Sequence, residues 1–310
     1  MKVFRGNFSP DDFKRPVLTL GSYDGLHLGH QEIIRRVLEE ARKRGGEGVV
    51  FTFEPHPAKV LHPSDPFPLI TPYGKKMKLL EEMGVQAVIN YPFTLELASF
   101  SPERFVKEVL LERVNPEKVI VGYNFTFGSK KGGTAANLER MGRELGFEVE
   151  VVPPFKVGHQ VVSSSRIREL IQRGAIPEAN RLLGREFLIV GEVVPGKGRG
   201  RDLGFPTANI QTDQELLPPR GVYAAWAHLD RDRQAAVVNI GTRPTFGEGE
   251  FTIEAYLPGY GGDLYGRELM LGLVQRLREE RPFEGPGELS RQIAEDVKRA
   301  LEILQGKGGR

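Results

Sequence analysis

The chain has 310 residues, and its 43 lysines and arginines nearly balance its 41 aspartates and glutamates, so the net charge of +2 supplies no field for a nucleic-acid partner. The absence of cysteine excludes disulfides, thiolate metal sites and cysteine nucleophiles. No apolar run has the roughly 20 residues of a membrane span, and the N-terminus lacks the apolar core of a signal peptide. We therefore expect a cytoplasmic protein of about two domains with no membrane partner.

Strand-like and helix-like segments alternate along the first half of the chain. Strands are predicted at 17–21, 48–53, 87–91, 118–125 and 147–152, with helices at 30–44, 72–83, 102–114 and 134–145 between them. Two further helices are predicted at 163–173 and 177–183. Strands that alternate with helices of about 10–15 residues indicate an α/β domain whose parallel sheet is connected by crossover helices.

The second half is rich in short β-prone runs separated by glycine and proline. Strands are predicted at 187–194, 221–228, 235–240, 251–257 and 269–277, and a helix at 287–304 closes the chain. Strands without intervening helices are typical of an antiparallel barrel or sandwich. The change in pattern predicts two domains, residues 1–183 and residues 184–310.

The sequence GSYDGLHLGH at 21–30 lies between the first predicted strand and its helix, where an open parallel sheet binds ligands. His27 and His30 lie near the helix N-terminus, and imidazoles there can donate hydrogen bonds to phosphate as charge builds during nucleotidyl transfer. Glycines at 21, 25 and 29 let the backbone turn tightly and approach a ligand closely. Gly21, Asp24 and Gly29 join the histidines as candidate nucleotide-binding residues. The alternative is a loop whose histidines only cap the helix. A zinc pair is disfavoured, because zincin histidines stand four residues apart.

Three other segments carry candidate ligand groups. FEPHP at 53–57 and GYNFTFGSKK at 122–131 follow predicted strands, and SSSRIR at 163–168 opens a helix. The hydroxyls and guanidinium groups of the last segment suit a triphosphate. A rigid turn and a plain helix cap are the structural alternatives. The convergence of these segments on one edge of the sheet favours a ligand site.

A near-match to a phosphate-binding P-loop, GEVVPGKG at 191–198, opens the second half. Gly198 replaces the serine or threonine that would bind magnesium, and no helix pattern follows, so we reject a P-loop. The segment GKGRG at 196–200, with Gly196, Lys197 and Gly198 as its candidate nucleotide-binding residues, is predicted instead to be a flap that covers phosphate. A flexible hairpin tip is the alternative.

In LGFPTAN at 203–209, Thr207 and Asn209 point the same way if the segment is extended. Their uncharged oxygens can hold Mg²⁺ only alongside ATP phosphates, which suits a phosphotransferase. Polar side chains in solvent are the alternative. Glu254 alternates with Ile253 and Ala255, so by pattern alone it is a solvent-facing strand residue.

Together these motifs resemble the prokaryotic bifunctional riboflavin kinase/FMN adenylyltransferases (FAD synthetases). The resemblance of GSYDGLHLGH, FEPHP, NFTFG and SSSRIR to their adenylyltransferase domain implies a Rossmann-like nucleotidyltransferase fold, in which the two histidines stabilise the transition state. It also places Ser164, Arg166 and Arg168 in the ATP site. Asn124 becomes a pocket residue for flavin or nucleotide, although many members carry aspartate there.

The strings GRGRDLGFPTAN, NIGTRPTF and LREERPF resemble, in order and spacing, the family's riboflavin kinase domain, an antiparallel β-barrel with a terminal helix. The resemblance implies that Thr207 and Asn209 bind Mg²⁺ and ATP. Glu254 then becomes the base that takes the proton of the flavin 5′-hydroxyl, and Arg278 a flavin-site residue. The sequence YLPGY at 256–260 departs from the family's usual HLLDF.

The resemblance implies a bifunctional enzyme that phosphorylates riboflavin to FMN and joins FMN to the AMP part of a second ATP. Riboflavin, FMN, FAD and ATP are thus the expected partners, with Mg²⁺ as cofactor, and a homo-oligomer is left open. Two alternatives stay open: a class I aminoacyl-tRNA-synthetase-like nucleotidyltransferase, suggested by HLGH and by KKMK at 75–78, and a flavin-binding regulator with decayed catalysis. The near-neutral charge disfavours the first, and the intact motifs disfavour the second.

Overall fold

The chain folds into two compact units in the computed structural model, which describes residues 1–196, 199–229, 232–242 and 251–307. Unit 1 comprises Met1–Pro68 and Tyr73–Ser163, and unit 2 comprises Leu69–Pro72 and Ser164–Arg310. The short segment of unit 2 is held by Gln214, whose Nε2 donates to the Ile70 carbonyl over 3.0 Å.

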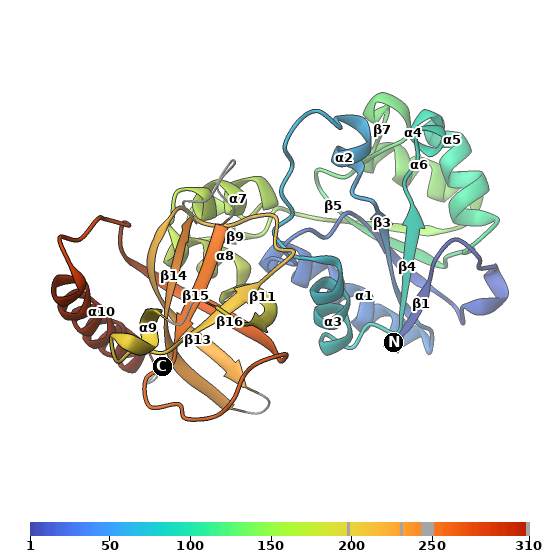
Figure 1. The fold of residues 1–310 in the computed structure, drawn as a ribbon. Helices are drawn as coiled ribbons and strands as arrows, with labels where there is room; N and C mark the ends of the chain where they lie inside the picture. Colours follow the sequence, from blue (N-terminus) through green and yellow to red (C-terminus); the bar gives the residue numbers. More distant parts are fainter. Residues whose placement is uncertain (197–198, 230–231, 243–250, 308–310) are drawn as a thin grey trace. The chain divides into compact units, whose positions relative to one another are not determined.

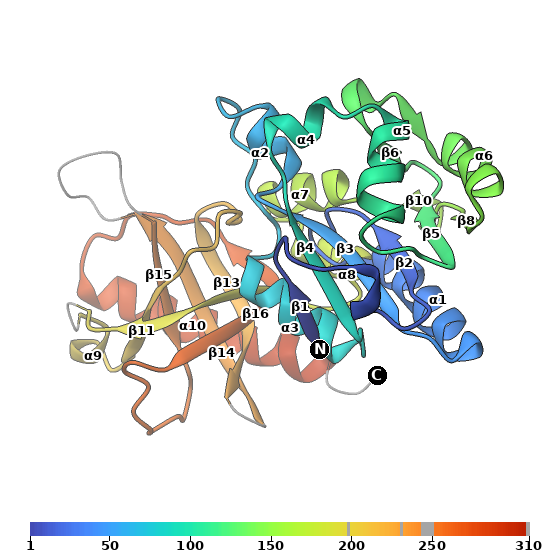
Figure 2. The same cartoon turned by 90° about the vertical axis from the view of Figure 1, so that its right-hand side faces the viewer.

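Six strands of unit 1 form one parallel sheet (Figure 2). They are β1 (Lys2–Phe4), β2 (Val17–Leu20), β3 (Gly48–Glu54), β4 (Ala87–Pro92), β5 (Lys118–Gly122) and β8 (Glu148–Val152). Their order is β1-β4-β3-β2-β5-β8, and every neighbouring pair is parallel. The chain runs outward from β2 through β3 and β4, then crosses to the other side of β2 for β5 and β8. The strand order therefore reverses between β2 and β5.

Helices cover both faces of this sheet, which explains why its strands read as continuous apolar runs. The helices of unit 1 are α1 (Leu28–Arg44), α2 (Pro57–Leu61), α3 (Tyr73–Glu82), α4 (Leu95–Ser99), α5 (Pro102–Arg104), a π-helix (Phe105–Leu111) and α6 (Ala135–Leu145), with 3-10 turns at Pro10–Asp12 and Ser129–Lys131. Two short strand pairs complete the unit: β6 (Thr126–Phe127) with β7 (Gly133–Thr134), and β9 (Lys156–Val157) with β10 (Gln160–Val161). On one face, α1 and α3 pack against Val50 and Val88. On the other, α6 and the π-helix pack against Leu18 and Phe51.

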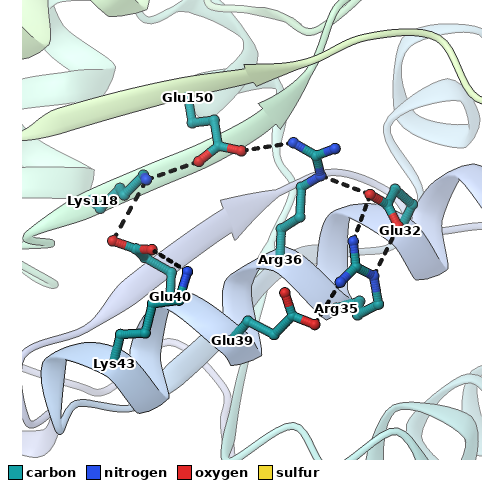
Figure 3. A network of polar contacts seen from close by, with 8 residues as sticks. All are labelled: Glu32, Arg35, Arg36, Glu39, Glu40, Lys43, Lys118 and Glu150. Carbon is teal, nitrogen blue, oxygen red and sulfur yellow. Dashed lines mark hydrogen bonds and ion pairs between the residues drawn. The ribbon is translucent and has the colours of Figure 1, made fainter.

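Charged side chains tie α1 to strands β5 and β8 (Figure 3). Arg36 on α1 pairs with Glu32 at 2.7 Å and with Glu150 on β8 at 3.0 Å. Glu150 pairs in turn with Lys118 on β5 at 2.8 Å. Lys118 lies 3.6 Å from Glu40, which returns the network to α1. The network thus links one helix to two strands of the sheet.

Loss of the Glu32 charge is expected to destabilise unit 1 in a pH-dependent way. Hydrogen bonds from Arg35 and then Arg36 lower the pKa of Glu32 from 4.5 to about 2, so its pairs stabilise fully above pH 4.5 and fade as the pH falls toward 2. Glu32→Gln should therefore lower the free energy of unfolding at neutral pH by on the order of 1 kcal/mol, because solvent screens pairs this exposed. Urea unfolding followed down to about pH 3 should show the difference from the parent shrinking. A difference that persists at low pH contradicts this, and Glu82→Gln, exposed on α3, is the control.

The strands of unit 2 close into an antiparallel barrel. They are β11 (Phe187–Val194), β12 (Thr207–Gln211), β13 (Gly221–Leu229), β14 (Asp232–Thr242), β15 (Phe251–Tyr256) and β16 (Glu268–Arg278). Their order around the barrel is β11-β12-β15-β14-β13-β16, and β16 pairs back to β11. Alternate residues fill the interior, as Ile253 and Ala255 do on β15, while their neighbours face outward.

Helices pack against the outside of this barrel. The helices of unit 2 are α7 (Ser164–Gln172), α8 (Ile176–Leu183), α9 (Arg199–Asp202) and α10 (Pro286–Lys307). The last of these lies along the barrel (Figure 1), where Ala300 and Leu304 are buried against β13 and β16. Asn180 joins α8 to the barrel: its amide donates to the Leu273 carbonyl and accepts from the Phe187 N–H, each over 2.8 Å.

The predicted α/β domain and the predicted antiparallel barrel with its terminal helix are confirmed. No helix in the described part of the chain is both long and apolar enough to cross a membrane. Several predicted element ends are wrong by two or three residues, because the local pattern does not show side-chain caps and turns. The first helix starts at Leu28 rather than residue 30, the strand from 118 ends at Gly122 rather than residue 125, and the helix from 102 ends at Leu111 rather than residue 114. The strand predicted at 235–240 spans Asp232–Thr242, and the last helix ends at Lys307 rather than residue 304.

Candidate active sites

The loops after β2 and β5 leave neighbouring strands at the point where the order of the sheet reverses. Open α/β sheets bind ligands outside the carboxyl ends of the strands at such a point, because the two crossover connections run in opposite directions. Residues 21–27 follow β2, and residues 123–125 follow β5. The topology thus supports the predicted location of a nucleotide site.

Two stacked histidines start α1. His27 is the N-cap residue, and its Nδ1 accepts a hydrogen bond from the His30 backbone N–H over 3.2 Å. The two rings lie with centroids 3.6 Å apart and planes 15° from parallel. Because Nδ1 of His27 accepts, the proton of the neutral ring is on Nε2. His27 therefore does cap the helix, and its Nε2–H is a hydrogen-bond donor at the positive end of the helix dipole.

The backbone before α1 takes up left-handed conformations. Gly25 has a φ of +87°, and Tyr23 and Leu26 have φ values of 50° and 40°, which L side chains rarely adopt. Buried contacts hold the loop in this form: the Tyr23 hydroxyl lies 2.5 Å from Thr19 Oγ1, and burial raises the pKa of Tyr23. Gln31 Nε2 donates to the Leu26 carbonyl over 2.8 Å. Backbone strain of this kind is concentrated at ligand sites.

Two of the candidate glycines make room for aromatic rings. A Cβ at Gly29 would lie 3.3 Å from the His27 ring, and a Cβ at Gly21 would lie 3.1 Å from the Tyr23 ring. Neither position has a positive φ, so of the three glycines expected to turn the backbone only Gly25 takes up the left-handed conformation. Asp24 beside it is buried, with 4% of its surface exposed.

The segments after β3 and β5 contribute differently. In FEPHP, His56 caps α2 by accepting the Ala58 N–H over 3.1 Å, and its ring stacks on Phe67 at 4.5 Å. That histidine thus fits the rigid-turn alternative. Asn124 after β5 is exposed, and its part in a pocket stays a prediction.

Ser164, Arg166 and Arg168 lie on α7, which belongs to unit 2. Arg166 Nη1 contacts Glu169 Oε2 at 2.7 Å, and this hydrogen bond lowers the pKa of Glu169. The motifs predict that these three residues share one ATP site with the histidine loop, which belongs to unit 1. That shared site stays a prediction.

The barrel brings Thr207, Asn209 and Glu254 together. Because β12 is extended, Thr207 and Asn209 project from the same face of the sheet, and Asn209 pairs with Glu254 on the neighbouring strand β15. The Thr207 hydroxyl donates to Glu254 Oε2 over 3.5 Å. Since Ile253 and Ala255 fill the interior, Glu254 lies on the outer side of the barrel, where it is half-buried. The strand pattern correctly predicts that Glu254 faces outward, but it also predicts a solvent-exposed side chain, whereas Glu254 is half-buried.

Asn239 extends this row and was missed by the sequence reasoning. Strand β15 lies between β12 and β14, and Glu254 pairs with Asn209 on one side and with Asn239 on the other. Directly paired residues project from the same face of a sheet. A Cβ at Gly241 would lie 2.6 Å from Glu280 Oε1 and 3.5 Å from Asn239 Nδ2, so a second carboxylate is close by. The signal was present in the strings NIGTRPTF and LREERPF, which contain both residues.

The predicted flap begins over this row. A Cβ at Gly196 would lie 2.0 Å from Asn209 Nδ2, and a Cβ at Gly200 would lie 3.3 Å from Thr207 Oγ1. Lys197 and Gly198, which also belong to the predicted flap, lie outside the described residues. The described part of the segment therefore packs closely on the polar row.

Arg278 on β16 is anchored to α10. Its Nη2 lies 2.9 Å from Asp296 Oδ2, its Nε donates to the same carboxylate, and its Nη1 donates to the Glu279 carbonyl. The guanidinium also lies 5.5 Å from the Phe283 ring. These contacts fix the guanidinium plane, and the ligand contact assigned to Arg278 stays a prediction.

A surface hollow of about 920 Å³ lies elsewhere in unit 1, along β8 and α6 and beside the start of β5. Two of its cations are committed to ion pairs, Arg44 with Glu148 at 2.7 Å and Lys118 with Glu150 at 2.8 Å. None of its lining residues belongs to the candidate loops after β2 and β5.

Known proteins share both halves of the chain. A family model described as FAD synthetase matches residues 9–166, and one described as riboflavin kinase matches residues 183–304. The bifunctional riboflavin kinase/FMN adenylyltransferase of Escherichia coli (strain K12) is 34% identical over 98% of this chain and 98% of its own length. That of Bacillus subtilis (strain 168) is 35% identical over 94% of this chain and 93% of its own.

A solved structure agrees with the fold. A crystal structure named a macrolide-efflux protein from Streptococcus pneumoniae is 30% identical, covers 96% of this chain and 98% of its own, and has a TM-score of 0.87. The efflux in its name is said of that protein. The two family matches and the full-length relatives agree with one another, and they confirm the resemblance seen in the motifs. The chain therefore belongs to the bifunctional riboflavin kinase/FMN adenylyltransferase family.

Proposed function

We propose that this chain makes FAD from riboflavin in two ATP-dependent steps, in the cytoplasm and without a nucleic-acid or membrane partner. The observation that carries the proposal is the polar row of Thr207, Asn209 and Glu254 on the barrel, in a chain that also places two stacked histidines at the reversal point of a parallel sheet. We assign riboflavin phosphorylation to residues 184–310 and FMN adenylylation to residues 1–183. The ranges matched by the two family models support this division.

In the kinase step, Glu254 accepts the proton of the riboflavin 5′-hydroxyl. The hydroxyl oxygen attacks the γ-phosphorus of ATP, the bond from that phosphorus to the bridging oxygen breaks, and ADP leaves. The hydroxyl of Thr207 holds one carboxylate oxygen of Glu254, which orients the base. Phosphoryl transfer depends mainly on positioning and charge stabilisation, so a half-buried carboxylate with fixed geometry is enough.

The donor set on β12 suits Mg²⁺. The Thr207 hydroxyl and the Asn209 amide oxygen are hard oxygen donors, which Mg²⁺ prefers. Among the described residues no group of three or more histidine and acidic side chains could hold a metal ion, so the balancing charge would come from the ATP phosphates. Thr207 and Asn209 would hold the ion with ATP, and the bound ion would neutralise charge on the phosphates.

In the adenylylation step, the FMN phosphate attacks the α-phosphorus of a second ATP, and pyrophosphate leaves. The attacking group belongs to the substrate, so the chain needs no nucleophile of its own. His27, with its proton on Nε2, and His30 donate hydrogen bonds to the phosphate oxygens as negative charge builds. Arg166 and Arg168 are assigned to the leaving phosphates because guanidinium groups bind phosphate through paired donors.

A methyl group at Gly196 is expected to impair the kinase step. Because its Cβ would lie 2.0 Å from Asn209 Nδ2, the amide must rotate out of the row, and Gly196→Ala should lower kcat/KM for riboflavin phosphorylation roughly tenfold or more. Steady-state FMN formation at varied ATP measures this. In the control Gly261→Ala, the new Cβ meets nothing within 4 Å. Equal kinetics in the two variants would show that the close approach of Gly196 has no catalytic consequence.

Product analysis tests the proposed function. The purified chain is incubated with riboflavin, ATP and Mg²⁺, and flavins are separated by chromatography. FMN should appear first and FAD should follow. The absence of both products overturns the proposal and favours the flavin-binding regulator. If FMN forms but no FAD appears, even when FMN is added, the chain is not an FMN adenylyltransferase. The full-length match to bifunctional riboflavin kinase/FMN adenylyltransferases argues against the aminoacyl-tRNA-synthetase alternative.

A further inference from the structure

A lysine is buried beneath the histidine loop of unit 1. Lys76 lies on α3, and only 7% of its surface is exposed. The helix packs on the same face of the sheet as α1, through residues that include Leu80. A buried ammonium group is costly unless nearby groups compensate it, so its partners indicate what it does.

Hydrogen bonds connect Lys76 to the loop. Its Nζ donates to Thr52 Oγ1 on β3 over 3.4 Å. The Thr52 hydroxyl, which is fully buried, donates in turn to the carbonyl of Ser22 over 3.2 Å. Ser22 lies in the strained turn between β2 and the histidines. A chain of two hydrogen bonds therefore runs from α3 through β3 to the backbone of the loop.

The charges around Lys76 come from two of the sequence motifs. Burial lowers the pKa of Lys76, and the carboxylates of Glu54 and Asp24 oppose that effect. Glu54 ends β3 in FEPHP, and Asp24 is a buried residue of the histidine loop. The Tyr73 ring, 5.9 Å from Nζ, is a further neighbour. Two carboxylates and one ammonium thus share this end of the sheet.

We infer that Lys76 is a positioning residue for the adenylylation step. Through Thr52 it fixes the turn that precedes His27, and its charge offsets Asp24 and Glu54. Its ammonium thus offsets negative charge at the end of the sheet that must accept ATP and the FMN phosphate. This inference rests on the proposed function, because it assigns adenylylation to the loop.

Removing the charge of Lys76 should impair FAD formation from FMN and leave riboflavin phosphorylation unchanged. Lys76→Met is expected to lower kcat/KM for FAD formation from FMN roughly 10- to 100-fold, with a higher KM for ATP and a lower kcat, because a misplaced site is a poor catalyst and added negative charge repels phosphate. Lys76→Arg should restore a part of the loss in kcat and a part of the affinity for ATP. Lys78→Met, which alters an exposed lysine of the same helix, should match the parent.

A second variant separates the hydrogen bonds from the charge. Thr52→Val keeps the shape of the side chain and the ammonium of Lys76 but breaks the connection to Ser22. It should lower kcat for FAD formation and leave KM for ATP close to the parent value. Riboflavin phosphorylation by the same molecules is the internal control, and it should not change in any of these variants.

The outcomes are distinguishable. A Lys76→Met chain with the parent's FAD kinetics overturns the inference and leaves the proposed function intact. Equal loss of both activities in Lys76→Met and Thr52→Val also overturns it, because it would show that Lys76 only supports the fold. A parent chain that forms no FAD from FMN overturns the proposed function, and the inference fails with it.

Discussion

Riboflavin phosphorylation is expected to fall roughly 10²- to 10⁴-fold when Glu254 is replaced by glutamine, because an amide cannot accept the proton of the flavin hydroxyl. Glutamine has nearly the same shape and can still meet the Thr207 hydroxyl, which lies 3.5 Å from Glu254 Oε2 in the parent, so the barrel should fold normally. FAD formation from added FMN should stay at the parent rate, since that step is assigned to residues 1–183, which do not include Glu254. Both rates can be measured on one preparation by chromatographic separation of FMN and FAD.

The matched control for this variant is Glu268→Gln. Glu268 is also a strand glutamate of the barrel, but it is exposed on β16. Its substitution should leave both rates unchanged. If Glu254→Gln phosphorylates riboflavin at the parent rate, Glu254 is not the base. If a folded Glu254→Gln chain loses FAD formation from FMN as well, the assignment of the two steps to separate sites is wrong.

The double variant His27→Ala with His30→Ala should lose FAD formation and keep riboflavin phosphorylation. FAD formation from FMN is expected to fall roughly 10²- to 10³-fold or more, because two donors aimed at the developing phosphate charge are lost. FMN formation from riboflavin should be unchanged, so FMN should accumulate in a reaction that starts from riboflavin. Single-turnover assays with FMN and ATP would assign the loss to the chemical step.

The capping role of His27 calls for a second variant. Alanine at this N-cap removes the hydrogen bond to the His30 N–H and is expected to cost about 1 kcal/mol of helix stability. Asparagine is a good N-cap residue, so His27→Asn should keep the stability of α1 while still losing adenylylation. Parent-like FAD formation in His27→Asn would show that capping is the main role of His27. His62→Ala, at an exposed histidine of unit 1, should be silent.

The histidine loop could be predicted from the sequence because its signals are local. A strand, a glycine-rich loop and a helix follow one another within 30 residues, and strand order places the loop at the reversal point. The barrel was predicted from the same kind of pattern, β-prone runs separated by turns. What the local pattern missed is the true helix start at Leu28, which depends on a side-chain cap.

Residues whose importance depends on partners far along the chain could not be predicted. Asn239 joins the polar row only because β14 pairs with β15 in a register that sets it opposite Glu254. Lys76 appears in the sequence as one of several lysines in KKMK, and its burial against β3 is a tertiary property. Helix periodicity likewise could not reveal that Phe105–Leu111 is π-helical. Pairing register and packing supply this information.

Mixing two variant chains, each of which has lost one activity, tests most directly whether one chain carries two separate active sites, with FMN as the product of one and the substrate of the other. The Glu254→Gln chain and the His27→Ala/His30→Ala chain are each given riboflavin, ATP and Mg²⁺, alone and together. Alone, the first should form almost no flavin product and the second should accumulate FMN. Together they should form FAD, because the second supplies FMN to the intact adenylyltransferase site of the first. FMN that accumulates in the mixture without conversion to FAD would contradict the two-site assignment, and so would FAD formed from riboflavin at the parent rate by either chain alone.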